Sequence, residues 1–591
     1  MSTELSRRNF VAGVAGLTAG AASMAGLAPM LAKASETEVP DSWDYDYDIV
    51  VCGAGGSGLL AALKANDEGC KVICIDANYD CGGHACVSYG ITHSGGGTSY
   101  QKEQGIEDSP DQYYIDHTNP VAADSRFNDP AIIRECADRM PECFEWMREK
   151  GMKMKGDVVN SMGAGDCDTV ARSAFSDPTG YINLFDGKVN EGEPSGVGIT
   201  RPFEESARAQ GVDFMMNRHM DALIQDEDGR VVGIRASYSP RYKSDGTQLV
   251  GIHADQDIDE TAEQITIHAA KAVILATGGG SGNVAYRTMF DPKLGAHMDG
   301  CAGEPYSYQD ASGEIAGLAI GAGLDSAGSW TYQATMAVVP AQRIGCRYTY
   351  INLVFGEDSD LWEQAGAKGI VLTDYNGAIQ VNMLGKRFVN EDLGYSTSVD
   401  TGAEAKDVYS HTALGSVILN EGTGAAERVG GPIWTIFDDA YAQEQGYTLE
   451  YPYVDEANGY FFKADTIEGL AEAIVNKYYE DVKMDPATLK ETVDNYNAMC
   501  DAGEDTEFGK PAEDLEKKIE TGPFYAAWAT PNMHDCLCGL RTDGHRQVLT
   551  CAKEPIEGLF ACGECAGGHR THGLGKVQTS GYIAGLYAAQ A

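Results

Sequence analysis

The amino-acid sequence predicts an α/β fold in which helices cover a largely parallel β-sheet. A β-rich run at residues 48–52 leads into a glycine-rich turn at 53–58, an apolar helical segment and a second β-rich run at 71–76. Two further β-rich runs, at 272–280 and 558–564, end in glycine turns far downstream. A strand, a glycine turn, a helix and a strand in this order are typical of a Rossmann-like unit. We expect the returning strands to extend the same sheet.

The length and composition of the chain limit the classes of protein to which it can belong. Its 591 residues are enough for several domains, and a hydrophobic content of 43% is enough for a large core. Lys and Arg number 44 and Asp and Glu 88, so the formal net charge is −44. We therefore expect no nucleic-acid partner, because phosphate neutralisation needs a basic surface. The 71 glycines indicate tight turns and close approach of the backbone to a ligand.

The first glycine-rich turn predicts a binding site for a dinucleotide. Its first glycine makes the turn, its second lets the backbone approach a pyrophosphate, and its third lets helix and strand pack closely. The N-terminus of the helix then faces the phosphates, and Asp76 at the end of the second strand would bind the ribose hydroxyls. The residues expected at the dinucleotide here are Gly53, Ala54, Gly55, Gly56, Ser57, Gly58, Asp76 and Ala77.

The glycine segments that follow favour FAD over NAD as the dinucleotide. Two of them come soon after Asp76, and two end the returning strands. Flavoproteins with the glutathione-reductase type of fold use such returning strands to close around the cofactor. For each segment alone, the alternative is an ordinary strand followed by a turn. We expect non-covalent FAD, and we add to its site Gly82, Gly83, His84, Gly96, Gly97, Thr277, Gly278, Gly279 and Glu564.

Motifs along nearly the whole chain after residue 45 resemble those of one flavoprotein family. From Asp76 to His84 the chain keeps the family's spacing between an acidic residue and Gly-Gly-Asn, with His84 in place of the Asn. Further matches lie at residues 308–310, 319–323, 377–391, 434–439, 492–497, 563–568 and 580–585. The chain thereby resembles the flavoprotein subunits of soluble fumarate reductases, whose relatives include urocanate reductase and the ketosteroid dehydrogenases.

This resemblance implies an FAD-binding domain of the glutathione-reductase type that is interrupted by an α+β capping domain. The FAD-binding domain would span residues 45–330 and 520–591, and the capping domain 331–519, with the substrate at their junction. The resemblance also implies that FAD is contacted by Asp310, Asp535, Gln578 and Thr579. Because the chain carries no Cys-x-x-Cys-His haem motif, we expect electrons from a separate donor, such as a cytochrome or a membrane quinol-oxidising protein.

The resemblance places the proton donor of the reaction at Tyr395. In this family a hydride moves between the flavin and an activated C=C bond, and a side chain of the capping domain handles the proton. Fumarate reductases carry an arginine at this position, and the ketosteroid dehydrogenases carry a tyrosine. The ordinary pKa of a phenol is about 10, so Tyr395 would need a positive or hydrogen-bonding neighbour. The alternative is a tyrosine that only packs at the domain junction.

The expected substrate-binding residues differ from those of fumarate reductases. His534 matches a substrate-binding histidine, Asp535 replaces a second histidine and Gly573 replaces an arginine. A dicarboxylate needs two anion sites, ideally arginines, so we expect an α,β-unsaturated monocarboxylate or an enone rather than fumarate. His534, with Arg570 or His572, would polarise the activating group of that substrate. The alternative for Arg570 is a solvated loop residue.

Two cysteine pairs lie close to these residues in the sequence. Cys536-x-Cys538 and Cys562-x-x-Cys565 could bind zinc or an iron–sulfur cluster, or form a redox disulfide. Neither spacing completes a ferredoxin or zinc-ribbon pattern. Buried thiols are therefore the preferred interpretation, and we expect no metal.

Residues 1–34 predict a twin-arginine export signal. Arg7 and Arg8 precede a Gly/Ala-rich apolar run, and residues 32–34 offer a small-x-small cleavage site. We therefore expect the twin-arginine translocase as a partner and export across the cytoplasmic membrane. The alternative is an uncleaved membrane anchor, which the length of the run allows but its weak hydrophobicity disfavours.

Together these features predict an exported, FAD-dependent oxidoreductase that reduces an activated C=C bond, in the manner of an anaerobic respiratory enzyme. Two alternatives stay open. A dehydrogenase of the 3-ketosteroid type would run related chemistry in the oxidative direction. A flavin electron carrier would use no small substrate, but the implied capping domain favours catalysis because such domains enclose a substrate.

Overall fold

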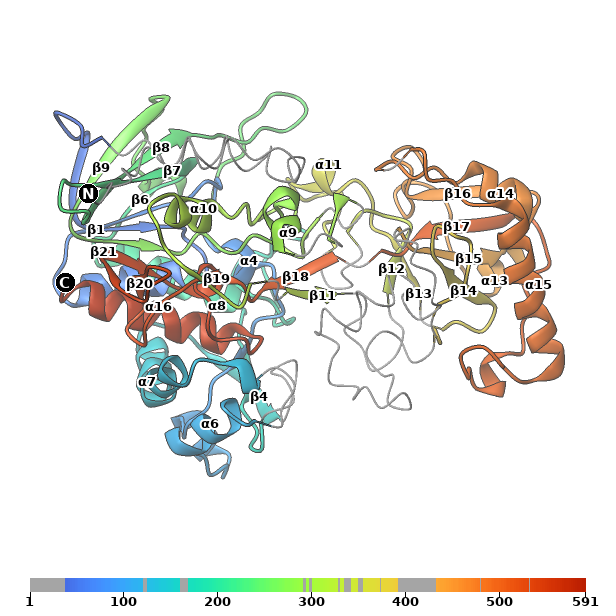
Figure 1. Cartoon of the computed structure of the whole chain (residues 1–591), viewed down its shortest axis with the longest axis horizontal. Coiled ribbons are helices and arrows are strands. Elements are labelled where there is room, and N and C mark those ends of the chain that lie inside the picture. The colour runs from blue at the N-terminus through green and yellow to red at the C-terminus, as the bar shows by residue number, and fades with distance from the viewer. Residues whose placement is uncertain are drawn as a thin grey trace, which may run out of the picture.

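The chain folds into two bodies that lie side by side, a larger one with blue, green and red segments and a smaller one in yellow and orange (Figure 1). The computed structural model describes residues 38–120, 125–159, 168–290, 294–296, 300–327, 330–333, 342–348, 354–372, 374–388, 390–391, 432–478, 480–530 and 532–591. The expected export signal at 1–34 and the expected proton donor Tyr395 lie outside these residues. Within them, no helix is both long and apolar enough to cross a membrane.

A twisted sheet of eight strands forms the centre of the larger body. Its main path runs β20-β21-β9-β1-β2-β6, and each neighbouring pair is parallel except β20 with β21. The hairpin of β7 and β8 joins β9 in antiparallel fashion. The bounds are β1 Tyr45–Cys52, β2 Val72–Ile75, β6 Asp213–Met215, β7 Arg218–Gln225, β8 Val231–Tyr238, β9 Gln264–Leu275, β20 Gln547–Leu549 and β21 Pro555–Ala561. The four β-rich runs of the sequence thus lie in one sheet, which confirms the predicted α/β class.

The first strand is apolar throughout its second half because both faces of the sheet are covered. Ile49 and Val51 belong to a core shared with the helices, whereas Val50 and Cys52 belong to a second core that contains Leu223 of the hairpin. A strand covered on both sides carries a continuous hydrophobic run. The packed helices are α3 (Gly58–Asp67), α7 (Pro130–Glu149), α8 (Val197–Ala209) and α16 (Leu574–Ala588), with α3 against α8 and α16.

Short helices and a three-stranded antiparallel sheet, β3-β5-β4, lie beside this core. Ser109 caps α6 by accepting from the amide of Gln112, and Asp129 caps α7 by accepting from the amide of Ala131. Each of these helices begins with proline, whose missing N–H costs nothing in the first turn. The elements are α4 Gly83–Cys86, β3 Ile91–His93, α5 Ser99–Glu103, α6 Pro110–His117, η1 Ser125–Phe127, β4 Met154–Val159, β5 Ser173–Ser176 and η2 Ala254–Gln256.

The smaller body has its own antiparallel sheet, β14-β15-β17-β16. Its core contains Trp434, Trp528 and Leu489, and the two tryptophan rings meet edge to face. The elements are β14 Ala378–Val381, β15 Trp434–Asp438, α13 Asp439–Glu444, β16 Phe461–Ala464, α14 Ile467–Ala473, α15 Pro486–Ala502, η7 Ala512–Asp514 and β17 Phe524–Trp528. Since β17 lies beyond residue 519, this sheet extends past the expected end of the capping segment; the domain boundaries stay a prediction.

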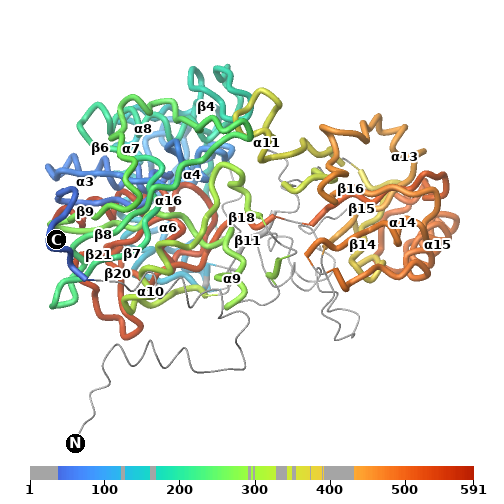
Figure 2. The backbone as a smooth tube through the Cα atoms, turned by 90° about the horizontal axis from the view of Figure 1, so that it is seen from above, coloured from blue at the N-terminus to red at the C-terminus, as the bar shows by residue number. Residues whose placement is uncertain are grey.

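Two paired strands lie between the bodies. β11 (Trp330–Gln333) leads toward the smaller body and β18 (Asn532–Cys536) returns from it, and the two pair in antiparallel fashion (Figure 2). The elements around them are α9 Val284–Phe290, α10 Ser312–Ala319, β10 Leu324–Asp325, β12 Gln342–Ile344, α11 Trp362–Ala365, β13 Ile370–Leu372, β19 Gly539–Leu540 and η8 Gly563–Cys565. The strand β18 therefore carries His534 and Asp535 from the smaller body into the larger one.

Candidate active site

One cavity opens at the carboxyl ends of β1, β2 and β9, where ligands bind in open parallel sheets. It reaches from the glycine-rich turn after β1 to the start of α16. The predicted site residues that line it are Gly53, Gly55, Gly56, Ser57, Asp76, Ala77, Gly83, His84, Thr277, Gly278, Asp310, His534, Asp535, Glu564 and His572. Residues within 53–57 and within 564–577, far apart in the sequence, therefore line the wall of the same cavity.

The glycine-rich turn leaves space for a ligand where side chains would stand. At Gly53 φ is +109°, and a Cβ there would lie 2.2 Å from the carbonyl oxygen of Ala276, so glycine is required. A Cβ on Gly55 would instead meet no protein atom within 3.8 Å, because Gly82 and Gly83 are 3.9 Å away. Since Gly55 lines the cavity, any larger side chain would fill the cavity itself. This cradle fits the pyrophosphate of a dinucleotide.

Asp76 closes the cradle at the end of β2. Its carboxylate accepts from the amide of Ala54 at 2.7 Å and from the amide of Asn78 at 2.7 Å. Burial raises the pKa of this carboxyl to about 6, although the two amides act in the opposite direction. Its place on the cavity wall fits the predicted role of binding ribose hydroxyls.

A histidine from β7 lies beside Asp310 at the same cavity. His219 contacts Asp310 through Nε2 at 2.9 Å and Asp221 through Nδ1 at 2.9 Å. Burial disfavours the charged imidazole, but the two carboxylates outweigh it and raise the pKa of His219 to about 10. The pKa of Asp310 is correspondingly lowered, chiefly by its bond to His219, against the effect of burial. The sequence motif predicted Asp310 but not its cationic partner.

At the other end of the cavity, Asp535 lies between two imidazoles. Its Oδ2 contacts Nδ1 of His572, and its Oδ1 lies 3.4 Å from Nδ1 of His534. The two imidazole rings are 4.9 Å apart between centroids. Burial raises the pKa of the Asp535 carboxyl, but His534 and His572 more than offset it and hold that pKa well below its ordinary value. A buried carboxylate of this kind orients both rings.

Three further titratable groups complete this end. Burial and the nearby charge of Asp535 raise the pKa of Glu564 well above its ordinary value. Burial and the charge of His534 lower the pKa of His84 to about 4. Nδ1 of His84 lies 2.7 Å from Nε2 of the Gln309 side chain. Burial lowers the pKa of Lys576, against the attraction of Asp535 and Glu564. This end of the cavity thus combines two acidic side chains, Asp535 and Glu564, with three imidazoles and the amine of Lys576.

Some predicted residues lie behind the wall rather than on it. Gly96 and Gly97 do not line the cavity. Their backbone amides donate instead to side-chain oxygens of Asp108 and Gln101. Arg570 also lies off the wall, with its guanidinium 5.0 Å from the centre of the Phe127 ring. The amide of Ala54 donates to Asp76, and the amide of Gly82 donates to the carbonyl oxygen of Ala54. Gly58 and Gly279 lie tightly against other residues of the protein. Gln578 accepts from Thr92, and Thr579 is buried.

Five basic residues on the described cavity wall were not predicted from the sequence: His93, Arg218, His219, Arg241 and Lys576. Arg241 donates to the side chain of Asn78 and to the carbonyl oxygens of Pro305 and Tyr306. Lys576 lies close to the glycines before α16, and His93 lies close to Gly96 and Gly97. Arg218, His219 and Arg241 lie in stretches without a motif, so no local pattern could have identified them.

The cysteines near the cavity are thiols. Cys536, Cys538, Cys562 and Cys565 are each buried and outside any disulfide, as the preferred interpretation held. The nearest sets of possible metal ligands are His534, Asp535 and His572, and His84, Asp535 and Glu564, with donor atoms within 4.8 Å of one another. Within the first set, Nδ1 of His572 contacts Oδ2 of Asp535 directly.

The parallel sheet, the glycine cradle and the acid after β2 define a dinucleotide-binding flavoprotein. The chain belongs to the FAD binding domain family, whose model matches residues 48–576. Family membership and the fit of the cradle together confirm FAD as the cofactor.

Known proteins similar to this chain are reductases and dehydrogenases. The fumarate reductase (cytochrome) of Shewanella frigidimarina is 27% identical over 560 residues, covering 92% of this chain and 77% of that protein. The acrylate reductase flavoprotein subunit of Shewanella woodyi is 26% identical over 584 residues, covering 97% and 94%. Homologues of this kind are FAD oxidoreductases that act on CH–CH groups, which confirms the predicted enzyme class.

Two solved structures share the fold. The open conformation of a flavocytochrome c3 fumarate reductase has a TM-score of 0.58 at 22% identity and covers 93% of this chain and 79% of that chain. A 3-ketosteroid delta1-dehydrogenase from Sterolibacterium denitrificans has a TM-score of 0.58 at 19% identity and covers 92% and 99%. The flavoprotein fold implied by the sequence motifs is thereby confirmed.

Proposed function

We propose that this chain is an exported, FAD-dependent ene-reductase for an α,β-unsaturated monocarboxylate or an enone. The observation that carries the proposal is a single cavity that joins the dinucleotide cradle to the polar side chains around Asp535. A reductase needs this continuity, because its cofactor and the reacting bond must lie in contact. The relatives named for fumarate and acrylate support the class of substrate.

The residues of the cavity form two groups, one that would bind the pyrophosphate and ribose of FAD and one that would bind its flavin ring. The cradle at Gly53–Ser57 would hold the pyrophosphate, and Asp76 would hold the ribose. The flavin ring would then be held by the remaining wall, which includes His84, Glu564 and Lys576. Reduced FAD supplies the hydride that one carbon of the C=C bond receives.

The two imidazoles beside Asp535 would bind the activating group of the substrate. Asp535 accepts from His572 and lies close to His534, so it fixes the orientation of both rings. Their N–H groups would donate to the carbonyl or carboxylate oxygen, where negative charge develops during reduction. The two arginines on the described cavity wall, Arg218 and Arg241, contact the segment of Asp76 and Asn78. A substrate with one anionic or neutral activating group therefore suits the wall around Asp535 better than a dicarboxylate.

Tyr395 would donate the proton to the carbon next to the activating group. The family resemblance supports this role, since the residue follows Asn390-Glu391 at the position of the family's acid. Together, one hydride and one proton saturate the C=C bond, and a separate donor replaces the two electrons. The net charge of −44 would steer a basic donor such as a cytochrome toward the enzyme. The twin-arginine motif at Arg7 and Arg8 supports export.

Reduced methyl viologen as the electron source tests the proposal directly. We expect the FAD-loaded enzyme to oxidise it when supplied with acrylate-type acids, aryl-substituted enoates or enones, and more slowly with fumarate. Tyr395→Phe is expected to lower turnover by about two orders of magnitude and to leave the FAD content unchanged. Tyr451→Phe, a change at an exposed tyrosine of the smaller body, is the matched control. Arg7→Lys with Arg8→Lys is expected to keep the protein in the cytoplasm.

Other outcomes would identify the alternatives. Reduction of a dye with a 3-ketosteroid, without viologen oxidation by any enoate or enone, would indicate a dehydrogenase. Full electron transfer to a protein partner by Tyr395→Phe, with no small substrate in the panel, would indicate an electron carrier.

A further inference from the structure

The loop at residues 568–572 carries His572 into the cavity and is held from outside it. The carbonyl oxygen of Gly568 accepts from the amide of Asp129 at 2.8 Å. The amide of Arg570 donates to Oδ1 of Asn128 at 2.6 Å. Both partners lie immediately before α7, so the start of that helix fixes the first half of the loop.

The second half of the loop is held by His117, the last residue of α6. Nδ1 of His117 lies 3.0 Å from Oγ1 of Thr571, the residue that precedes His572. Asn128 bonds both the carbonyl oxygen of His117, at 2.8 Å, and Oγ1 of Thr571, at 3.4 Å. His117 and Thr571 are 2% and 7% exposed, so water does not replace these contacts.

The orientation of His117 is itself set by two contacts. Its Nε2 lies 3.1 Å from Oδ1 of Asp168, and its ring stacks on Tyr113 at 3.9 Å with 13° between the planes. An imidazole whose two nitrogens and one face are all occupied has one orientation. The position of Asp168 therefore determines the orientation of the His117 ring, and this ring in turn holds the hydroxyl group of Thr571.

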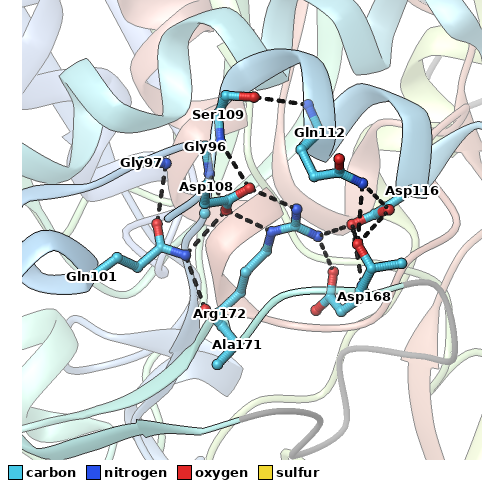
Figure 3. A network of polar contacts seen from close by, with 12 residues as sticks. Gly96, Gly97, Gln101, Asp108, Ser109, Gln112, Asp116, Asp168, Ala171 and Arg172 are labelled. Atoms are coloured by element: carbon cyan, nitrogen blue, oxygen red, sulfur yellow. Dashed lines mark hydrogen bonds and ion pairs between the residues drawn. The ribbon is translucent and has the colours of Figure 1, made fainter. Parts of the chain in front are cut away.

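Asp168 belongs to a buried ionic network around Arg172 (Figure 3). The guanidinium of Arg172 donates to both oxygens of Asp108, at 2.8 and 2.9 Å, and to Asp116 and Asp168 at 2.7 and 2.6 Å. Asp108 also accepts from the amide of Gly96. Removing one partner of such a network leaves buried charge uncompensated. The contacts with Arg172 and His117 therefore hold the carboxylate of Asp168 in one position.

We propose that His117 is a positioning residue for the active site, acting through Thr571 on His572. The contacts run from Arg172 through Asp168 and His117 to Thr571, and the next residue along the chain contacts Asp535. None of these outer residues lines the cavity, so they act on geometry rather than on the reacting atoms. The proposal rests on the proposed function for its kinetic readout only.

Thr571→Val tests the proposal, because valine keeps the shape of threonine and removes the hydroxyl group. We expect kcat to fall about tenfold to a hundredfold, as misplaced catalytic groups commonly cause, with smaller effects on KM, on FAD content and on the thermal midpoint. Thr571→Ser, which restores the hydroxyl, should recover most of the activity. His117→Phe keeps the ring on Tyr113 but loses both nitrogen contacts, and combined with Thr571→Val it should add little.

Hydrogen–deuterium exchange of the peptide containing residues 568–577 gives a readout that needs no substrate. We expect faster exchange in Thr571→Val and wild-type exchange in Thr571→Ser. Lys490→Ala, which removes an exposed ion pair of α15 with Asp494, is the control and should change neither readout.

Unchanged exchange in Thr571→Val would overturn the proposal, as would faster exchange with unchanged kcat. If the wild-type enzyme turns over no enoate or enone, the proposed function fails, and the exchange experiment still decides whether Thr571 holds the loop.

Discussion

His219 and Asp310 meet at 2.9 Å across the cavity although 91 residues separate them in the chain. The contact joins β7 to the segment before α10, two elements that carry no common motif. A second carboxylate, Asp221, contacts the other nitrogen of the same ring at 2.9 Å. The cavity wall therefore contains a cation that neutralises the acidic residue implied by the family resemblance.

This pair should make the stability of the apoprotein depend on pH. The pKa of His219 is raised from 6.5 to about 10 in the folded chain, so its stabilising charge is fully present below pH 6.5 and is lost as the pH rises through 10. His219→Gln should therefore lower the urea midpoint most at pH 6 and least above pH 10. A constant difference between variant and wild type across this range would contradict the assignment.

A side chain at Gly55 should block FAD. Because a Cβ there points into the cavity without meeting protein closer than 3.9 Å, Gly55→Leu should weaken FAD binding about tenfold to a hundredfold. The thermal midpoint of the apoprotein should change little, since a Cβ at this position meets no protein atom within 3.8 Å. Flavin fluorescence during titration measures the affinity. Gly356→Ala, outside the cavity, is the control, and equal FAD affinity in both variants would argue against the cradle.

Lys576 should raise the reduction potential of the bound flavin. It lies on the cavity wall in the first turn of α16, where the helix N-terminus adds positive potential. Reduction adds negative charge to the flavin, so loss of a side chain that can carry positive charge disfavours the reduced form. Lys576→Met should lower the two-electron midpoint by roughly 30 mV or more, equivalent to about 1.4 kcal/mol. Spectroelectrochemical titration gives the value, with Lys490→Met on the exposed face of α15 as control.

Arg387 should be essential to the stability of the smaller body. Its guanidinium donates to both oxygens of Glu391, at 2.9 and 2.8 Å, and to Asp505 at 2.9 Å, and all three side chains are buried. Arg387→Met leaves two carboxylates without their main partner, at a cost of about 3–5 kcal/mol. Urea unfolding followed by tryptophan fluorescence includes the signal of this body, whose core contains Trp434 and Trp528, two of the six tryptophans of the chain. A change within about 0.5 kcal/mol, as expected for a surface variant, would show that the network contributes little.

The glycine cradle could be predicted from the sequence because its constraints are local. Gly53 needs a positive φ, Gly55 needs an open Cβ position, and both follow from the turn between a strand and a helix. The acid after β2 is fixed by the same short unit. For this reason the dinucleotide-binding unit was accessible without any knowledge of tertiary contacts, whereas the choice of FAD depended on the later glycine segments and on the family resemblance.

The rest of the site could be predicted only in part, because its contacts join distant segments. The glycines at 96–97 match a cofactor-binding pattern, yet Asp108 and Gln101 take up their amides. His219 lies in a strand whose sequence gives no sign of its partner Asp310. Arg570 has the charge of a substrate-binding residue, but its guanidinium lies 5.0 Å from the centre of the Phe127 ring and off the cavity wall. Residue type and spacing do not encode which side of a loop faces the cavity.

The wall shared by Gly53–Ser57 and His572–Val577 has a consequence for biosynthesis. A ribosome completes the second of these segments long after the first, and domains fold largely in the order of their synthesis. Until α16 has been made and docked on α3, the cradle lacks one side and cannot enclose a cofactor. Flavin insertion therefore reports that translation has passed the end of the cavity, and a truncated chain would remain colourless.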